Sequence, residues 1–293
     1  MTDMRIGWSL PTMIAGIDGP TVIEWCRRIE ADGYSSIGFG ERIAYQNLEI
    51  FSVLSAAAAV TERVRLMSTI VVLPMHSETW VAKQSATLDV LSGGRYTLGV
   101  GVGGRNEDYR ALGSPFDHRF DRLDAQVARI RSLWSQEPPA PDLDPVGPRP
   151  VQADLPILSG AMGPKSIQRS ARWADGIAGF EMDPSADALG RSAAAMTEAW
   201  DAAGRDRAPY RMTSFWCALG DDAESQLRTY AARYLSVFGP EFAEALAASC
   251  TAAGPDAIRR AVDDARAAGF DEIQLVPTTT DIAELDRMAE VLA

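Results

Sequence analysis

The sequence predicts an α/β protein whose parallel strands close into an eight-stranded (β/α)8 barrel. Strand-like and helix-like segments alternate along all 293 residues, which is typical of a parallel sheet with helical crossovers. The length suits one such barrel and no shift in composition marks a boundary, so we expect residues 1–293 to form a single domain. An open doubly wound sheet with a cap domain is the alternative.

Eight short apolar segments are the predicted strands. They are residues 5–10, 36–40, 64–72, 96–102, 156–160, 176–180, 210–219 and 272–276. The third segment is a nearly continuous apolar run rich in β-branched side chains, as expected of a strand that is buried on both faces. Strands of this kind are typical of a (β/α)8 TIM barrel.

Helices are predicted between these strands, at residues 21–31, 49–60, 77–91, 119–134, 164–173, 186–203, 223–238, 255–268 and 282–292. The first is expected to begin with Thr21 as its N-cap and to end just before Gly33. Residues 137–154 are rich in proline and lack periodicity. They predict a long irregular insertion after the fourth helix.

The composition is that of a globular protein with an acidic surface. Apolar residues make up 46% of the chain, charged residues 23%, and the formal net charge is −12. Such a charge repels nucleic acid and anionic membranes, so we expect neither as a partner. Three separated cysteines form no metal-binding spacing, so we expect reduced thiols and no metal site. Without an apolar signal core near residue 1, the chain is expected to be cytoplasmic.

A glycine-rich run forms the fourth predicted strand. The segment Gly99-Val-Gly-Val-Gly-Gly104 satisfies the dinucleotide-binding pattern GxGxxG. That pattern needs a helix whose N-terminus holds a pyrophosphate, but a short segment containing Gly113 and Pro115 follows instead. We therefore interpret the glycines as a bare strand face against which a flat cofactor ring lies. A dinucleotide site and simple close packing are the alternatives.

Several separated segments closely resemble the bacterial luciferase-like monooxygenases, a family that includes coenzyme F420 (deazaflavin)-dependent reductases and dehydrogenases. These segments are residues 64–76, 82–103, 107–113, 119–134, 155–176, 254–258 and 268–273, and the resemblance covers nearly the whole chain. It implies a luciferase-like eight-stranded barrel, a flavin or deazaflavin cofactor and a homodimer.

The resemblance also implies where the cofactor ring lies. In this family the end of the third strand supports the ring, often through a bulge with a non-proline cis peptide. The matching residues here are Thr69, Ile70 and Val71, for which a plain buried strand is the alternative. On and after the glycine strand, the residues expected at the cofactor are Gly101, Gly103, Gly104 and Asn106.

A segment that leaves the fifth predicted strand is expected to hold the cofactor phosphate. Its small residues expose backbone N–H groups, the following helix N-terminus favours an anion, and a lysine adds positive charge. The residues in this predicted site are Ser159, Gly160, Ala161, Gly163, Pro164 and Lys165. A solvated lysine beside a loop is the alternative.

The predicted catalytic residues are Glu41, Arg42 and His76. The first two match an acidic residue that is often followed by histidine in this family. Arginine cannot relay protons near neutral pH, so Arg42 is expected to bind an anionic substrate, to bind a flavin carbonyl or to form an ordinary salt bridge. His76 follows the third strand and is the candidate general acid or base, whereas His118 is expected in a loop.

The predicted function is F420-dependent hydride transfer to or from a small organic substrate. A short chain without the long insertions of many two-component monooxygenases favours F420 over FMN. One alternative is a monooxygenase that uses reduced FMN and O2, and another is a non-catalytic flavin-binding homologue.

Overall fold

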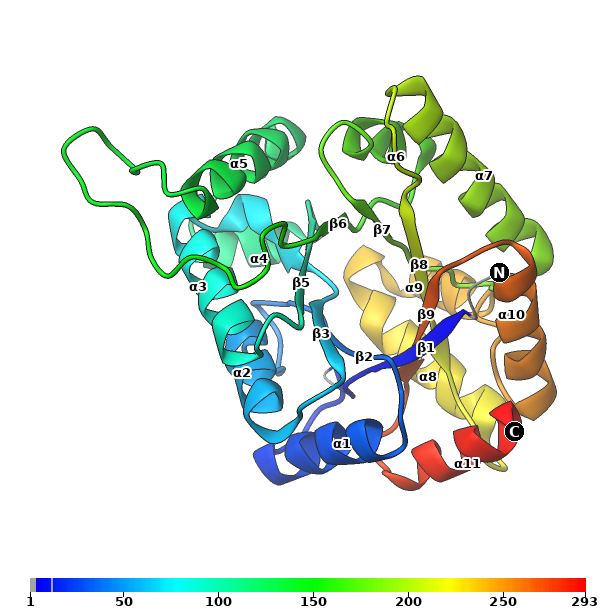
Figure 1. Cartoon of the computed structure of the whole chain (residues 1–293). Coiled ribbons are helices and arrows are strands. Elements are labelled where there is room, and N and C mark those ends of the chain that lie inside the picture. The colour runs from blue at the N-terminus through cyan, green and yellow to red at the C-terminus, as the bar shows by residue number, and fades with distance from the viewer. Residues whose placement is uncertain (1–3, 12) are drawn as a thin grey trace.

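The protein is a closed parallel barrel surrounded by helices (Figure 1). The computed structural model describes residues 4–11 and 13–293. Over these residues nine strands form one sheet in the order β3-β2-β1-β9-β8-β7-β6-β5-β4, and an additional pairing of β3 with β5 closes the ring. Because β3 and β4 are two parts of the third predicted strand, the barrel has eight strand positions, and the alternative of an open sheet is wrong.

The strands agree closely with the predicted segments. Their bounds are β1 Arg5–Ser9, β2 Ser36–Phe39, β3 Arg65–Ser68, β4 Val71–Val72, β5 Tyr96–Gly101, β6 Ile157–Ser159, β7 Gly176–Ala178, β8 Tyr210–Cys217 and β9 Glu272–Pro277. All pairings between them are parallel, so their carboxyl ends form one common edge, where barrels of this type place their chemistry.

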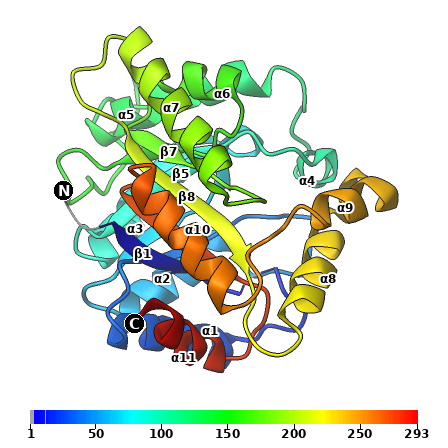
Figure 2. The ribbon, with the colours of Figure 1, turned by 90° about the vertical axis from the view of Figure 1, so that its right-hand side faces the viewer.

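Helices cover the outside of the barrel (Figure 2). They are α1 Gly19–Ala31, α2 Ile50–Val60, α3 Glu78–Leu91, α4 Asn106–Ala111, α5 Arg119–Trp134, α6 Pro164–Ser170, α7 Ala186–Ala202, α8 Ala223–Leu235, α9 Pro240–Ala247, α10 Pro255–Ala267 and α11 Ala283–Leu292. Figure 2 shows α4, α8 and α9 on the side to which β8 points. None of the described helices is long and apolar enough to cross a membrane.

Two helix predictions were wrong in detail. The first helix begins at Gly19, where the carboxylate of Asp18 accepts a hydrogen bond from the backbone N–H of Thr21, so Asp18 and not Thr21 is the N-cap. The predicted helix 223–238 ends at Leu235 and continues only as a 3-10 turn, after which Gly239, at φ +98°, redirects the chain into α9. Left-handed φ values of this kind favour glycine, which is why the chain turns there.

The predicted insertion after α5 is irregular over residues 137–154, as expected. In Figure 1 this segment (green, between α5 and β6) leaves the body of the barrel and returns. Its return is fixed by Asp89, whose buried carboxylate accepts hydrogen bonds from the backbone N–H groups of Val151 and Gln152 at 2.7 and 3.0 Å. The insertion therefore has an ordered base even though it contains no helix or strand.

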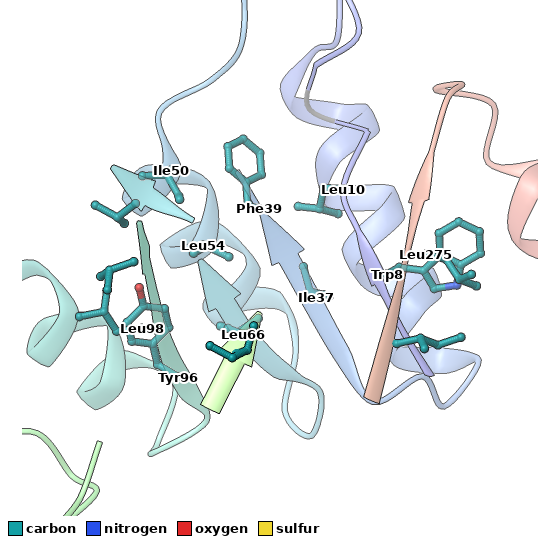
Figure 3. Close-up of a cluster of buried hydrophobic side chains, with 14 of the residues drawn as sticks. Trp8, Leu10, Ile37, Phe39, Ile50, Leu54, Leu66, Tyr96, Leu98 and Leu275 are labelled. Carbon is teal, nitrogen blue, oxygen red and sulfur yellow. The ribbon is translucent and has the colours of Figure 1, made fainter. Parts of the chain in front are cut away.

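Large apolar side chains of successive strands point outward from the barrel and pack against the surrounding helices (Figure 3). Five of these side chains are 0% exposed and come from five different strands, namely Trp8, Ile37, Leu66, Leu98 and Leu275. The inner face of the strands is buried as well, because residues such as Met67 and Gln274 meet inside the barrel, so both faces of the strands are covered. Each fully buried side chain of this size contributes about 2 kcal/mol to folding.

One charged group is fully buried inside the barrel. Glu272, the first residue of β9, accepts hydrogen bonds from Ser35 Oγ, Ser36 Oγ and Tyr210 Oη at 2.6, 2.5 and 2.5 Å and pairs with Arg65 at 3.2 Å. Burial opposes ionisation of this carboxyl, but Arg65 and the three hydroxyl donors outweigh burial and lower its pKa below the usual 4.5. The carboxylate therefore joins four elements of the barrel.

Replacing Glu272 by glutamine is expected to lower the free energy of unfolding by about 3 kcal/mol at pH 7, because Arg65 loses its buried partner. Since the folded-state pKa is depressed, the contribution of Glu272 is present above pH 4.5 and is lost as the pH falls through the folded-state pKa. Urea denaturation of both proteins at pH 7 and below pH 4 measures this. A difference that stays constant over that range would contradict the prediction, and Glu290→Gln on the exposed face of α11 is the control.

Candidate functional site

A carboxylate and an imidazole meet at the carboxyl edge of the barrel. Glu41 follows β2, and His76 follows the 3-10 turn Leu73–Met75 that comes after β4. His76 Nε2 lies 3.0 and 3.1 Å from the two carboxylate oxygens of Glu41, and Glu41 Oε2 also accepts a hydrogen bond from the backbone N–H of Val72 at 2.7 Å. The Glu41 side chain is 5% exposed and the His76 side chain 23%, so the pair is shielded but reachable.

The interruption predicted in the third strand lies between β3 and β4. A cis peptide bond joins Thr69 to Ile70, and neither residue is proline. Val71 begins β4, which pairs with β5 through Val100 and Gly101. The alternative of a plain, unbroken strand over these residues is therefore wrong.

Atoms of the neighbouring third strand fill the space beside two glycines of strand β5. A Cβ atom at Gly99 would lie 2.1 Å from the carbonyl oxygen of Ser68, and one at Gly101 would lie 2.4 Å from Cδ1 of Ile70. The expectation that a cofactor ring lies against this bare face is therefore wrong at Gly99 and Gly101, where the interrupted third strand occupies the space. At these two positions the alternative of close packing applies.

The last two glycines of the run lie beside a small cleft. Gly103 has a φ of +60°, and a Cβ atom there would lie 2.8 Å from Val72 Cγ1, whereas Gly104 has only Phe238 near it, at 3.8 Å. The residues lining the cleft are Glu41, Val72, Met75, Gly103, Gly104, Arg105, Asp108 and Tyr109. The carboxylate of Glu41 thus places the Glu41–His76 pair at the edge of this cleft.

Arg42 points into a group of aromatic rings instead of an acidic partner. Its guanidinium carbon lies 3.9 Å from the ring centre of Tyr45 and 5.6 Å from that of Tyr234. Within residues 4–11 and 13–293 it forms no ion pair, so the alternative of an ordinary salt bridge is wrong. Burial, reinforced by the nearby charge of Arg105, lowers the pKa of Arg42 below its usual range, and the group stays charged at neutral pH.

A larger pocket of about 460 Å³ opens on the same edge of the barrel. Its walls are Met13, Ile14, Tyr45, Asp222, Ser225, Gln226, Thr229, Tyr230, Arg233 and Thr278. These residues come from the segments after β1, β2, β8 and β9, which are neighbours in the ring. The volume is in the range of sites for small organic ligands.

The predicted phosphate segment is only partly exposed. Ser159 is buried and shares a hydrogen bond of 2.7 Å with Ser170, and a Cβ atom at Gly160 would lie 3.0 Å from Ile70 Cγ2, so both residues face the protein interior. Ala161 is also buried. The following residues are more accessible: Gly163 is the N-cap of α6, Pro164 begins the helix, and Lys165 is exposed.

The sequence of this chain matches one known protein family over nearly its whole length. The sequence model described as luciferase-like monooxygenase matches residues 4–292. The chain belongs to the luciferase-like monooxygenase family. An uncharacterised protein of Mycobacterium tuberculosis is 38% identical over 53% of this chain and 57% of its own length. A putative coenzyme F420-dependent oxidoreductase of the same species is 32% identical over 40% of this chain and 39% of its own.

The chain thus spans about half the length of the curated family members it matches. Two solved structures share the whole fold of this chain. An F420-dependent secondary alcohol dehydrogenase in complex with an F420–acetone adduct superposes with a TM-score of 0.83 at 19% identity, covering 99% of this chain and 98% of that one. The oxygenating constituent of 3,6-diketocamphane monooxygenase from Pseudomonas putida, in complex with FMN, gives a TM-score of 0.73 at 16% identity, covering 99% and 98%.

Some of the site residues predicted from the sequence lie together in the structure, and other residues at the site were not predicted. Glu41, Arg42, His76 and Gly103 meet at one edge, whereas Asn106 is an exposed residue at the start of α4, and His118 is the exposed N-cap of α5. The missed residues are Tyr45, Arg105, Tyr230 and Tyr234. The spacing of Tyr230 and Tyr234, four residues apart on a predicted helix, was a signal for two rings on one face.

Proposed function

We propose that this protein is an oxidoreductase that uses coenzyme F420 to transfer hydride to or from a small organic substrate. The observation that supports this most directly is the Glu41–His76 pair at the barrel edge, next to a cleft and close to a pocket of about 460 Å³. Support for F420 over FMN comes from the relative named as F420-dependent and from the higher TM-score of the F420-dependent dehydrogenase.

The residues present fit a ring-shaped cofactor at the edge of the barrel. Gly104 leaves open space beside the cleft, and the buried guanidinium Nε atoms of Arg42 and Arg105 have no hydrogen-bond partner among the described residues. The residues we propose around the ring are Thr69, Ile70, Val71, Gly103 and Gly104. F420 supplies hydride transfer and activates oxygen poorly, because its ring has carbon in place of the reactive flavin nitrogen.

His76 is the residue that we propose to hold and move a proton. Because both oxygens of the Glu41 carboxylate face Nε2, this nitrogen carries hydrogen and donates it to Glu41. The other ring nitrogen, Nδ1, has no hydrogen-bond partner within the described residues and is free to accept a proton or to donate one. Glu41 fixes the orientation of the imidazole, and its bond to the N–H of Val72 ties that orientation to β4.

Cofactor titration tests the proposal. The purified protein is titrated with oxidised and reduced F420 and, separately, with FMN, and hydride transfer is followed by the F420 absorbance over a broad panel of alcohols, ketones and unsaturated carbonyl compounds. Tight F420 binding with transfer to at least one compound is expected. Tight FMN binding without F420 binding would favour the reduced-FMN monooxygenase, and F420 binding without any transfer would favour the non-catalytic homologue.

Lys165→Ala is expected to weaken binding of F420 about tenfold and to leave binding of its phosphate-free core within a factor of two. The exposed lysine lies at the start of α6, where a helix N-terminus and a cation together favour an anion. Lys83→Ala is the matched control, because Lys83 is the other lysine of the chain and donates instead to the carbonyl of Gly147. Equal weakening of both ligands would rule out a phosphate contact by Lys165.

We further propose a cytoplasmic homodimer, an assignment that rests on the family resemblance and on the cysteines. The three cysteines are free thiols, and burial raises the pKa of Cys26 to about 12 and that of Cys250 to about 11, which keeps both thiols protonated. Light scattering after size-exclusion chromatography measures the oligomeric state, and a mass of 31.6 kDa, that of one chain, would contradict the dimer.

A further inference from the structure

Two arginines and three tyrosines form a cluster at the mouth of the barrel. We call Arg42, Arg105, Tyr45, Tyr230 and Tyr234 the Arg–Tyr cluster. The guanidinium carbon of Arg42 lies 3.9 Å from the ring centre of Tyr45, that of Arg105 lies 4.5 Å from the ring centre of Tyr234, and the rings of Tyr230 and Tyr234 stack at 6.3 Å. Tyr45 and Tyr230 line the large pocket and Arg105 lines the small cleft, so the cluster lies between the two.

Neither arginine forms an ion pair with an acidic residue in the part of the chain that the structure describes. Among residues 4–11 and 13–293, none of the five N–H donors of Arg42 reaches an acceptor, and Arg105 makes one hydrogen bond, from Nη2 to the carbonyl oxygen of Tyr234 at 3.1 Å. The carboxylate of Asp108 is nearby, but it accepts hydrogen bonds from the backbone N–H groups of Ile43 and Ala44 at 3.1 and 2.7 Å. The cluster is therefore rich in donors and poor in acceptors.

This arrangement is costly without an anion. Arg42 and Arg105 carry like charges, and burial together with that repulsion makes the charged form of Arg42 less favourable. The chain has 40 acidic residues against 28 basic ones, yet among the described residues none forms an ion pair with either arginine, and the nearby Asp108 is bonded to backbone N–H groups. Guanidinium groups with free N–H donors bind carboxylate or phosphate oxygens by strong, charge-assisted hydrogen bonds.

We propose that the Arg–Tyr cluster binds an anionic group of the substrate, a carboxylate or a phosphate, while the rest of the substrate occupies the adjoining pocket of about 460 Å³. The substrate class is then a small organic anion whose body contacts both apolar and polar side chains, such as Met13 and Tyr230 on one hand and Gln226 and Thr229 on the other. Anion binding by the cluster does not depend on the proposed oxidoreductase function. The assignment of the anion to the substrate does rest on that function.

The cofactor phosphate is the other source of the same chemistry, and the arrangement of the strands favours the substrate. The pocket is built on the segments after β2, β1, β9 and β8, which are consecutive in the ring. The proposed phosphate segment at Gly163–Lys165 follows β6, which lies outside this arc. Four members of the Arg–Tyr cluster follow β2 or β8 and so belong to the arc that holds the pocket, namely Arg42, Tyr45, Tyr230 and Tyr234, whereas Arg105 follows β5.

Calorimetric titration of the cofactor-free protein of residues 1–293 with benzoate and with benzamide tests the charge preference, because the two probes have similar shapes and differ in charge. We expect benzoate to bind at least tenfold more tightly. Arg42→Met and Arg105→Met should each remove that preference, whereas Arg42→Lys should keep part of it. Arg266→Met removes a charge from an exposed ion pair on α10 and should leave the preference unchanged. Circular dichroism checks that each variant is folded.

The same variants separate substrate from cofactor. If Arg42 held the cofactor phosphate, Arg42→Met would weaken binding of F420 much more than binding of its phosphate-free core, and the substrate assignment would be overturned. Equal benzoate binding by wild type and a folded Arg42→Met protein would also overturn it. Failure to bind either F420 or FMN, with the benzoate preference intact, would instead refute the proposed function and leave the anion site standing.

Discussion

Replacing Gly99 by alanine is expected to destabilise the barrel by about 3 kcal/mol. The added Cβ atom would lie 2.1 Å from the carbonyl oxygen of Ser68, which is backbone and cannot move aside as a flexible side chain can. The contact lies where β3 and β5 close the barrel, and Ser68 Oγ is hydrogen-bonded there to both the N–H and the carbonyl of Gly99 at 2.8 and 2.9 Å. Closure of the ring leaves no room for a side chain.

A fall in Tm of about 5 °C measures this effect by calorimetry. Gly190→Ala is the matched control, since it makes the same substitution inside α7 at a position with no heavy atom within 4 Å of the added Cβ. There the change is expected to stabilise the protein by about 0.5–1 kcal/mol, because alanine restricts the unfolded chain and favours helix. Opposite signs are therefore expected from one chemical change, and a Tm of Gly99→Ala equal to that of wild type would contradict the packing described here.

His76→Ala is expected to reduce kcat for the proposed hydride transfer about 100-fold or more, because a positioned general acid or base contributes about 10²–10⁴ to such a rate. F420 affinity should change by less than about threefold, since the imidazole bonds to Glu41 rather than lining the cleft. The pH profile of kcat should lose one limb in the variant. A structural role alone would lower stability without changing the shape of that profile.

His118→Ala is the matched control, because His118 is the other histidine of the chain and its side chain is 85% exposed on the outer surface. Glu41→Gln tests the positioning role separately. Its amide has one acceptor for the two donors that the carboxylate now satisfies, the N–H of Val72 and Nε2 of His76, so kcat should fall by less than in His76→Ala. If both His76→Ala and Glu41→Gln left kcat unchanged, the proton-handling assignment would be wrong.

Predictions from local pattern succeeded where one segment determines the outcome. The apolar run at residues 64–72 predicted a buried strand, and the prolines at 137–154 predicted an irregular insertion, because β-branched side chains and proline act on their own backbone. The cap of α1 was misassigned by three residues, since Asp18 and Thr21 are both common cap residues and only backbone geometry separates them. Helix α9 was missed because Gly239 and Pro240 also fit a loop.

The site was only partly predictable for a different reason. Glu41 and His76 could be placed at strand ends, but their contact at 3.0 Å joins residues 35 positions apart and depends on how neighbouring strands align. The glycines of β5 showed in sequence that something approaches the backbone, yet at Gly99 and Gly101 the approaching atoms belong to Ser68 and Ile70 of the neighbouring strand, not to a cofactor. A glycine pattern signals close approach and does not identify what approaches.

The sequence by itself determined the alternation of strands and helices, the barrel that this alternation favours, and the chemical types of the residues at the carboxyl edge, because each follows from local propensity and from the polarity of parallel strands. Only the tertiary structure decided which of those residues act together. It joined Glu41 to His76, filled the face of Gly99 and Gly101 with the third strand, and placed Arg42 among tyrosine rings, where no described acidic residue forms an ion pair with it. These outcomes depend on distances between segments far apart in the chain, which closure of the barrel fixes and local sequence does not.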